Sequence, residues 1–217
     1  QRISSINSIS AICEVTGADI REVSRAIGKD SRIGSKFLDS GPGFGGSCFK
    51  KDILNLVYLA EYFGLKEVAN FWESVVNINN WHQNRISKIV IKKLFGTISQ
   101  KKIIILGFAF KANTNDTRES AAISICKDLI EEGANLLIYD PKVSPEQIES
   151  DLKIKQKNII GNKNYLNEQL GGWEFCKNLD IFDNAHAAVI LTEWEEFKNI
   201  NWEKASKKMS HPAWVVD

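Results

Sequence analysis

The sequence predicts an α + α/β protein, in which an all-helical domain is followed by a Rossmann-like domain built on a parallel sheet. In residues 1–98, apolar side chains recur every three or four positions and glycines end these runs, which is typical of helices. In residues 99–217, short continuous apolar runs alternate with helical patterns, which is typical of buried parallel strands joined by helices. We therefore place the domain boundary after residue 98.

Helices are expected in four stretches of the first domain: residues 1–16, 20–27, 49–62 and 65–95. Asp19 is positioned to cap the second of them, and Gly17, Gly28 and Gly64 are positioned as stops. The segment from Asn77 to Asn80 predicts a bend or break in the last helix, because asparagine favours caps and turns. Residues 30–36 read as a polar loop or short helix, which leaves Arg32 as a candidate ligand for an anion.

The second domain opens with a strand, a helix and a strand at residues 103–106, 121–132 and 136–139, which together predict a βαβ unit and hence a parallel sheet. A short helix is expected from Pro145, because proline suits the first turn. Residues 153–172, rich in Lys, Asn and Gly, predict a surface excursion. Two further strands, at 187–191 and 214–216, flank a helix at 202–208.

The bulk composition excludes several classes of protein. The 217 residues carry 28 Lys and Arg against 27 Asp and Glu, so no net field favours nucleic acid or a membrane surface. No apolar run reaches the roughly 20 residues of a membrane-spanning helix, and no secretion signal is visible. The four cysteines lack close pairs, which argues against a disulfide scaffold and a zinc site. We expect a reduced, cytoplasmic protein without a metal. Because the chain starts without Met inside a helical pattern and stops in a strand, we also expect a fragment.

A glycine-rich segment from Gly41 to Asp52 is the first candidate site. Its glycines permit backbone conformations and close ligand approaches that other residues do not. Cys48 follows the last glycine and precedes a helical pattern, so it is expected at a helix N-terminus, where the dipole favours a thiolate. Lys50 and Lys51 add positive charge. An incidental buried cysteine in a glycine-rich turn is the alternative.

The second candidate site is the loop of residues 107–120 after the first strand. A dinucleotide-binding protein carries Gly-x-Gly-x-x-Gly at this place, but only Gly107 is present here. Lys111 and Arg118 favour an anionic ligand such as a nucleotide diphosphate, bound by side chains; the alternative is a capped loop with two solvated cations. Asp116 or Thr117 is expected to cap the next helix. A turn is expected at residues 140–141.

The two loops together, residues 43–52 and 107–120, resemble the UDP-glucose/GDP-mannose dehydrogenase family, and the likeness extends over nearly the whole chain. This resemblance implies that residues 1–98 are a central helical dimerisation domain with a catalytic cysteine loop. Residues 99–217 would then be a C-terminal UDP-binding domain. The family's N-terminal NAD-binding domain would be absent.

The resemblance also implies a reaction. The parent enzyme would oxidise UDP-glucose to UDP-glucuronate with two NAD⁺, through a thiohemiacetal and then a thioester on Cys48. Asp52 would orient water or relay protons. A homodimer through the central helices is implied, with a higher oligomer possible, and the fragment alone is expected to be inactive.

Site residues follow from the resemblance position by position. The implied substrate-binding residues are Arg32, Phe37, Leu38, Asp39, Ser40, Gly41, Pro42, Gly43, Phe44, Gly45, Phe110 and Lys111. The implied NAD-binding residues are Ser47, Cys48, Phe49, Lys50, Lys51 and Arg118. Two alternatives stay open: a dehydrogenase of GDP-mannose or a UDP-N-acetyl sugar, and a non-catalytic module for dimerisation or nucleotide-sugar binding.

Overall fold

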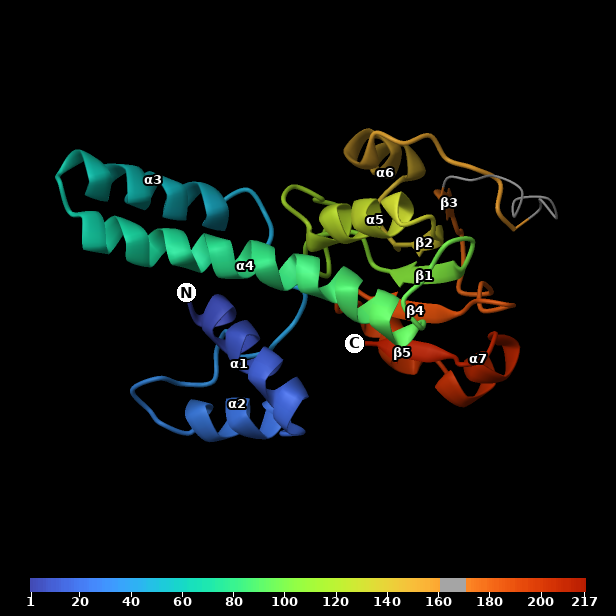
Figure 1. Ribbon diagram of the computed structural model, residues 1–217, viewed down its shortest axis with the longest axis horizontal. Helices are drawn as coiled ribbons and strands as arrows, with labels where there is room; N and C mark the ends of the chain where they lie inside the picture. Colours follow the sequence, from blue (N-terminus) through green and yellow to red (C-terminus); the bar gives the residue numbers. More distant parts are fainter. Residues whose placement is uncertain (161–170) are drawn as a thin grey trace. The chain divides into compact units, whose positions relative to one another are not determined.

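Four helices form where the apolar periodicity predicts them (Figure 1): α1 (Arg2–Thr16), α2 (Ile20–Gly28), α3 (Phe49–Tyr62) and α4 (Lys66–Lys93). Asp19 caps α2 as predicted, because its side chain accepts a hydrogen bond of 2.8 Å from the Arg21 N–H. Gly17 ends α1 in the left-handed conformation, with φ 78°. The predicted break at Asn77 to Asn80 is absent, because α4 runs through these residues as one helix.

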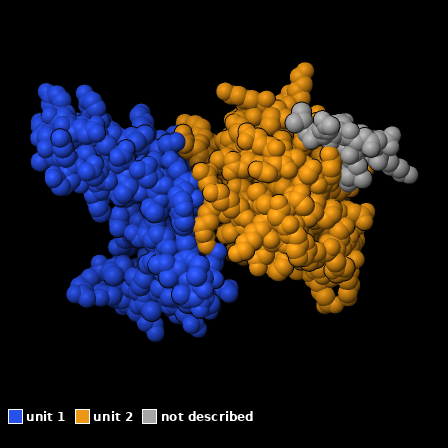
Figure 2. Space-filling view, viewed as in Figure 1, with its two compact units in different colours: residues 1–83 blue, residues 84–217 orange. Residues whose placement is uncertain are grey.

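This computed structural model describes residues 1–160 and 171–217, and the chain divides into unit 1, residues 1–83, and unit 2, residues 84–217 (Figure 2). In unit 1, α3 and the first part of α4 form an antiparallel hairpin (Figure 1). A small apolar cluster joins them, made of Val57, Ala60 and Ala69 with Trp72 packed against it.

The sheet of unit 2 is entirely parallel. It has five strands among the described residues: β1 (Lys102–Leu106), β2 (Asn135–Tyr139), β3 (Gly172–Phe175), β4 (Ala187–Ile190) and β5 (Trp214–Val216). Their order is β3-β2-β1-β4-β5. Strands β2 and β3 therefore lie on one side of β1, and β4 and β5 lie on the other side. The topological switch point therefore lies between the carboxyl ends of β1 and β4, where ligands bind in open α/β sheets.

Helices complete unit 2: α5 (Ala121–Glu131), α6 (Pro145–Leu152), the 3₁₀ helix η2 (Glu195–Asn199) and α7 (Trp202–Lys208). Figure 1 shows α5 and α6 side by side near β2, and the two helices contact each other. The cap of α5 is Ser120, whose Oγ accepts from the Ala122 N–H, so the prediction of Asp116 or Thr117 is wrong. Asp116 is engaged by Arg118 instead.

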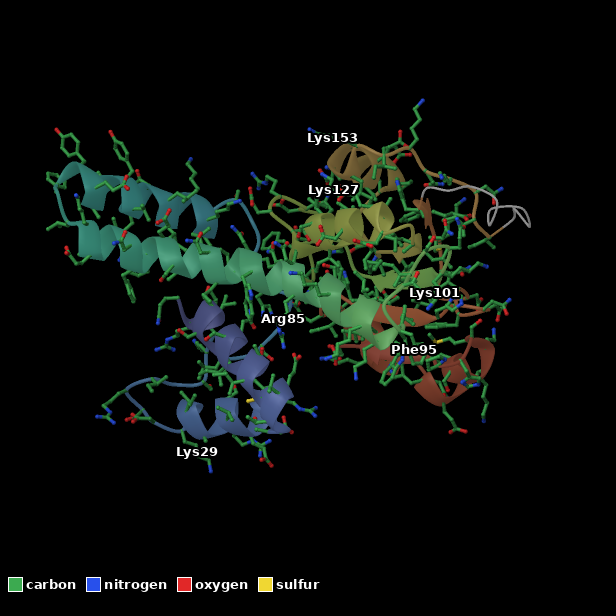
Figure 3. All side chains as sticks on the ribbon, in the orientation of Figure 1. Lys29, Arg85, Phe95, Lys101, Lys127 and Lys153 are labelled. Atoms are coloured by element: carbon green, nitrogen blue, oxygen red, sulfur yellow. The ribbon has the colours of Figure 1, made fainter. Side chains whose placement is uncertain are left out.

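The core of unit 2 lies on β1 and its neighbours. Residues 103–106 are completely buried, and each fully buried aliphatic side chain stabilises the fold by roughly 1.5–3 kcal/mol. Val90 and Leu94, near the end of α4, belong to the same core. Lys101, labelled in Figure 3, donates through Nζ to the Leu94 carbonyl at 2.7 Å and so satisfies an acceptor at the end of this helix.

Strand β3 was not predicted. At both ends of the expected surface excursion, residues 153–172, the chain is bonded to β3 and is not a free excursion. Gly172 already begins β3, and Trp173 is fully buried with its indole N–H bonded to the Ile154 carbonyl at 2.8 Å. The N–H groups of Ile159 and Ile160 both donate to Glu174, at 2.6 and 2.7 Å. The remaining residues of the excursion, 161–170, lie outside the described residues.

The described residues contain neither a membrane-spanning helix nor a metal-binding cluster of side chains. No helix there combines the length and apolar character needed to cross a bilayer. No group of three or more His, Cys, Asp or Glu side chains there could hold a metal ion.

Candidate active site

Cys48 is the N-cap residue of α3, as the sequence predicted. Its carbonyl accepts the first helical hydrogen bond from the Asp52 N–H at 2.9 Å, and its Sγ lies 3.8 Å from the Ser47 hydroxyl. Of the four cysteines of the chain, all of which are described, Cys48 is exposed and the other three are buried. The exposure excludes the alternative of an incidental buried cysteine. A thiol here meets solvent at the positive end of a helix dipole.

Two of the three buried cysteines have thiols with a raised pKa. Burial raises the pKa of the Cys126 thiol well above its usual range. Burial, helped by the charge of Glu174, raises the pKa of the Cys176 thiol to about 12. Both thiols are therefore protonated near neutral pH, and a protonated thiol is a poor nucleophile.

The loop before Cys48 is held by polar side chains from helix interiors. Gly41 is bonded on both sides of its backbone: its N–H donates to Asn7 Oδ1 at 3.0 Å, and its carbonyl lies 2.9 Å from His82 Nε2. The backbone of Phe44 pairs with the side chain of Asn79. All three polar residues are buried, at 5% exposure or less.

Asn7, Asn79 and His82 were not predicted, although the sequence carries a signal for the last two. Asn79 and His82 continue the apolar stripe of α4 that passes through Val75 and Val76, at spacings of three and four residues. A polar residue on an apolar helix face has to find a buried partner, so it indicates contact with irregular backbone nearby.

The predicted substrate-binding residues of unit 1 lie along this loop, with different exposures. Phe37 is exposed and has a left-handed backbone with φ 63°, whereas Leu38 is buried and its carbonyl accepts from Ser24 Oγ. The residues around Cys48 differ in exposure. Phe44 is buried, and Pro42, Gly43, Gly45, Ser47 and Lys50 are half-buried. The exposed ones are Asp39, Ser40, Gly41, Phe49, Lys51 and Asp52.

Arg32 is an exposed cation with an internal partner. Its Nε and Nη2 form two hydrogen bonds with the Asp30 carboxylate, at 3.0 and 2.6 Å, and its backbone N–H donates to the same group. These hydrogen bonds lower the pKa of Asp30, which therefore stays ionised. The guanidinium remains 87% exposed, so it is accessible to an anion.

In unit 2, the buried carboxylate of Asp140 organises the loop after β1. Oδ2 accepts from the N–H groups of Phe108 and Ala109, at 2.7 and 3.0 Å, and from the Trp194 indole at 3.2 Å. Oδ1 accepts from the N–H groups of the next turn, on Lys142 and Val143. The predicted turn at residues 140–141 is present, but the larger role of Asp140 was missed.

Gly107 and Thr192 meet at the switch point between β1 and β4. Gly107 has φ +91°, and a Cβ built on it would lie 2.4 Å from the Thr192 Cβ. Thr192 Oγ1 donates to the Ala109 carbonyl at 2.7 Å. Only glycine fits at position 107, because a larger residue would overlap Thr192. The contacts of Thr192 with Gly107 and Ala109 set the direction in which the chain leaves β1 towards Phe110.

Lys111 and Arg118 lie on the loop that begins at this point. Lys111 is exposed, and its Nζ lies 5.4 Å from the centre of the half-buried Phe110 ring. Arg118 binds Asp116 through Nε and Nη2, and this contact lowers the pKa of the Asp116 carboxyl. Two accessible cations at the carboxyl end of β1 suit an anionic ligand.

Tyr139 ends β2 at the same edge of the sheet. Its hydroxyl donates to Glu196 Oε2 at 3.0 Å. Burial, together with this hydrogen bond to a carboxylate, raises the pKa of Tyr139 to about 12. The phenol is therefore a hydrogen-bond donor throughout the physiological range.

The predicted site residues are thus divided between the units. Unit 1 brings Cys48, Asp52 and the loop from Phe37 together, and it also carries Arg32. Unit 2 carries Phe110, Lys111 and Arg118 on one loop.

Comparison with known proteins gives consistent results for both units. Residues 1–81 match the central domain of the UDP-glucose/GDP-mannose dehydrogenase family, and residues 104–217 match the UDP binding domain of that family. The UDP-glucose 6-dehydrogenase of Drosophila melanogaster is 50% identical over 227 residues, which cover 100% of this chain and 45% of that protein. The enzyme of the same name from Gallus gallus is 52% identical over 220 residues, covering 100% of this chain and 43% of its own. The chain spans about half the length of these relatives.

The fold also matches a solved structure. A UDP-glucose dehydrogenase from the archaeon Pyrobaculum islandicum superposes with a TM-score of 0.77 at 24% identity, covering 99% of this chain and 47% of the other. A likeness at this identity concerns the fold. The sequence matches cover both units, and on their strength the chain belongs to the UDP-glucose/GDP-mannose dehydrogenase family.

Proposed function

We propose that this chain is the cysteine-bearing and UDP-binding portion of an NAD-dependent dehydrogenase that oxidises UDP-glucose to UDP-glucuronate. One observation carries the proposal: Cys48 is exposed at the N-terminus of α3, directly after a glycine-rich loop whose backbone is fixed. Relatives about 50% identical over the whole chain, named UDP-glucose 6-dehydrogenase, support the choice of substrate.

Cys48 is proposed as the nucleophile. Its thiolate adds to the C6 aldehyde of the substrate, forming a C–S bond and a hemithioacetal oxygen that takes up a proton. Loss of a hydride from this adduct, for which NAD⁺ is the proposed acceptor, and of the hydroxyl proton would leave a thioester on Sγ. Attack by water would then release the carboxylate and return the thiol. Asp52 lies one helical turn beyond Cys48 and is exposed, so its carboxylate is suited to orient that water or accept its proton.

A substrate-binding role is proposed for one loop of each unit, taken by itself. Phe110 and Lys111 bind the UDP portion of a nucleotide sugar, because the exposed ammonium suits phosphate and the half-buried ring suits a base. The loop from Phe37 to Gly45 surrounds the sugar. Arg32 is proposed to reach the site of a partner subunit, which suits its exposure.

NAD is the proposed cofactor, and it supplies a hydride acceptor when bound. The residues present fit its charge: Lys51 and Arg118 are exposed cations suited to a diphosphate, and the exposed ring of Phe49 offers an apolar face. Ser47, Cys48 and Lys50 adjoin Phe49 and Lys51 in the chain and are proposed to border the nicotinamide with them. We place the principal NAD-binding domain in a part of the protein that precedes this chain, and we therefore expect the chain alone to be inactive.

A homodimer in the cytoplasm is proposed as the working form. The α3–α4 hairpin exposes large apolar side chains, among them Tyr62 at 72% and Phe63 at 69%. Side chains on the side of α3 away from α4 extend outward (Figure 3). A second copy of the chain is the proposed occupant of this face. Light scattering of the purified protein should give twice the chain mass, and Tyr62→Asp with Phe63→Asp should give the monomer mass.

The experiment for the reaction uses the full-length protein that contains this chain. With UDP-glucose and NAD⁺ in excess, we expect NADH formation at 340 nm, with two NADH for each UDP-glucuronate. Cys48→Ser should lose at least about 10³-fold in kcat, the size of effect expected for removing a nucleophile. GDP-mannose and UDP-N-acetyl sugars serve as competing substrates. A higher kcat/KM on either would favour a sister dehydrogenase, and no turnover on any of them would favour a non-catalytic binding module.

A further inference from the structure

Asn79 clamps the loop that leads to Cys48. Its side chain uses both ends of the amide on one residue: Oδ1 accepts from the Phe44 N–H at 2.9 Å, and Nδ2 donates to the Phe44 carbonyl at 3.1 Å. The pair reproduces the exchange of two hydrogen bonds between neighbouring strands. The amide carries its donor and its acceptor on two separate atoms, whereas an ionised Asp only accepts and Leu does neither, so neither Asp nor Leu can replace both bonds.

The clamp also explains a glycine. Gly43 has φ +117°, and a Cβ built on it would lie 2.8 Å from Asn79 Oδ1. A side chain at position 43 would therefore push the amide away from Phe44. The glycine provides the space that lets α4 approach the loop, so flexibility alone does not account for it.

An asparagine at position 79 would destabilise the fold if its amide lacked the hydrogen bonds to Phe44. Asparagine is a poor helix former, and a buried amide without hydrogen-bond partners destabilises a folded protein. Asn79 nevertheless lies within the 28-residue helix α4 at 4% exposure. Its polar groups are satisfied by the backbone of Phe44, so the helix and the loop are fixed to each other.

A short chain of contacts links the clamp to the cysteine. The Phe44 ring packs edge-to-face on the Phe49 ring, with centroids 6.1 Å apart and an interplanar angle of 77°. Phe49 is the first residue of α3 and directly follows Cys48. The same amide that fixes the backbone at Phe44 thus also supports the start of the helix that presents the thiol.

We propose that Asn79 is a positioning residue for the dehydrogenase reaction, which fixes the sugar loop and the Cys48 thiol relative to each other without contacting the substrate. The inference rests on the proposed function. It adds a residue in a helix interior to a site otherwise built from loops. Its effect should fall on the rate of the chemical step, because small displacements of a nucleophile reduce reaction rates by about 10²-fold.

The test compares Asn79→Leu and Asn79→Asp with Asn80→Ala in the full-length protein. Leu has a similar branched shape, although it is larger, and it makes neither bond. Asp matches Asn in size and keeps the bond from the Phe44 N–H, and Asn80 is the exposed neighbour on the same helix. We expect kcat with UDP-glucose to fall about 10- to 100-fold in the Leu variant and less in the Asp variant. The KM for NAD⁺ should stay within about twofold, and Asn80→Ala should match the wild type.

Hydrogen exchange supplies the second readout. The amide hydrogens of the peptide covering residues 41–48 should exchange faster than in the wild type in both Asn79 variants, and at the wild-type rate in Asn80→Ala. The measurement is made at a temperature where circular dichroism shows all proteins folded. If the Leu variant does not fold, the Asp variant decides. A folded variant with wild-type kcat overturns the inference, whatever its exchange. Wild-type protein that forms no NADH from UDP-glucose is a separate result, which rejects the proposed function.

Discussion

The N–H of Lys102, at the start of β1, donates a hydrogen bond of 3.2 Å to Nδ1 of His186, just before β4. Nδ1 must be unprotonated to accept it, so the bond requires a ring that carries at most the proton on Nε2. Burial lowers the pKa of His186, and the positive charges of Lys101 and Lys102 lower it further. The neutral imidazole therefore links the starts of β1 and β4 at the amino-terminal edge of the sheet.

This pairing predicts a pH dependence of stability. Because the folded-state pKa of His186 is below the unfolded value of about 6.5, the unfolded chain takes up the proton first as the pH falls. The free energy of unfolding should be unaffected by this group above about pH 6.5 and should decrease below it. His186→Asn keeps an acceptor near Nδ1 but does not titrate. Urea denaturation between pH 7.5 and about 5 should show a shallower loss for the variant; parallel curves for the two proteins would contradict the assignment.

Asp140 should be the most sensitive polar position in unit 2. Asp140→Asn keeps the volume but turns one charged acceptor into a donor, and that donor faces N–H groups of the loop. We expect a loss of about 2–4 kcal/mol in the free energy of unfolding, because hydrogen bonds to charged groups contribute about 1.5–3 kcal/mol each. Trp194→Phe removes a single donor to this carboxylate and should cost less than Asp140→Asn, about 1.5–3 kcal/mol. Equal losses for the two variants would show that the indole, and not the loop amides, dominates.

Alanine substitutions at Gly107 and Gly96 should distinguish the effect of backbone strain on stability from that of steric overlap. Both have positive φ, +91° and +80°, but among the described residues a Cβ at position 96 meets nothing within 4 Å, whereas one at 107 meets Thr192. Gly96→Ala should cost about 1 kcal/mol from backbone strain alone. Gly107→Ala should cost a further 1–3 kcal/mol or so from overpacking. Thermal denaturation measures both, and similar Tm values would mean that Thr192 can move aside.

Cysteine labelling should distinguish Cys48 from the rest. Iodoacetamide at neutral pH should add one carbamidomethyl group to the folded chain and four to the urea-unfolded chain, because Cys13, Cys126 and Cys176 are buried. Intact-protein mass spectrometry counts the groups, and peptide mapping locates them. Cys48→Ser should leave the folded chain unlabelled. Labelling of Cys13 as fast as Cys48 would contradict the burial pattern.

Most helices and the central strands could be predicted, because long amphipathic runs and fully apolar runs of four residues are strong signals. β3 was missed because Gly172 to Phe175 is short and contains Glu174, and its partner β2 is far away in sequence. Tertiary pairing decided that element. The 3₁₀ helix η2 was missed for a related reason, since a single turn carries no periodicity.

The candidate site was predicted in part. The residue types that carry chemistry, such as Cys48, Lys111 and Arg118, are visible in a sequence because their loops are rich in glycine or charge. Asn7 and Asp140 are not visible in this way, because their importance depends on backbone groups that only the folded chain brings near. Local pattern identifies the groups that react or bind. Three-dimensional packing identifies the groups that hold them.

The carboxylate of Asp140 has a consequence for the choice of ligand. In a sheet that binds a dinucleotide, the N–H groups after the first strand face the pyrophosphate. Here the corresponding N–H groups, on Phe108 and Ala109, already face a carboxylate of the protein itself. Asp140 thus acts as a tethered counter-anion in the place of a phosphate. The N–H groups of this loop are therefore already satisfied within the protein. The binding of an anionic ligand, as proposed above, is left to side chains such as Lys111.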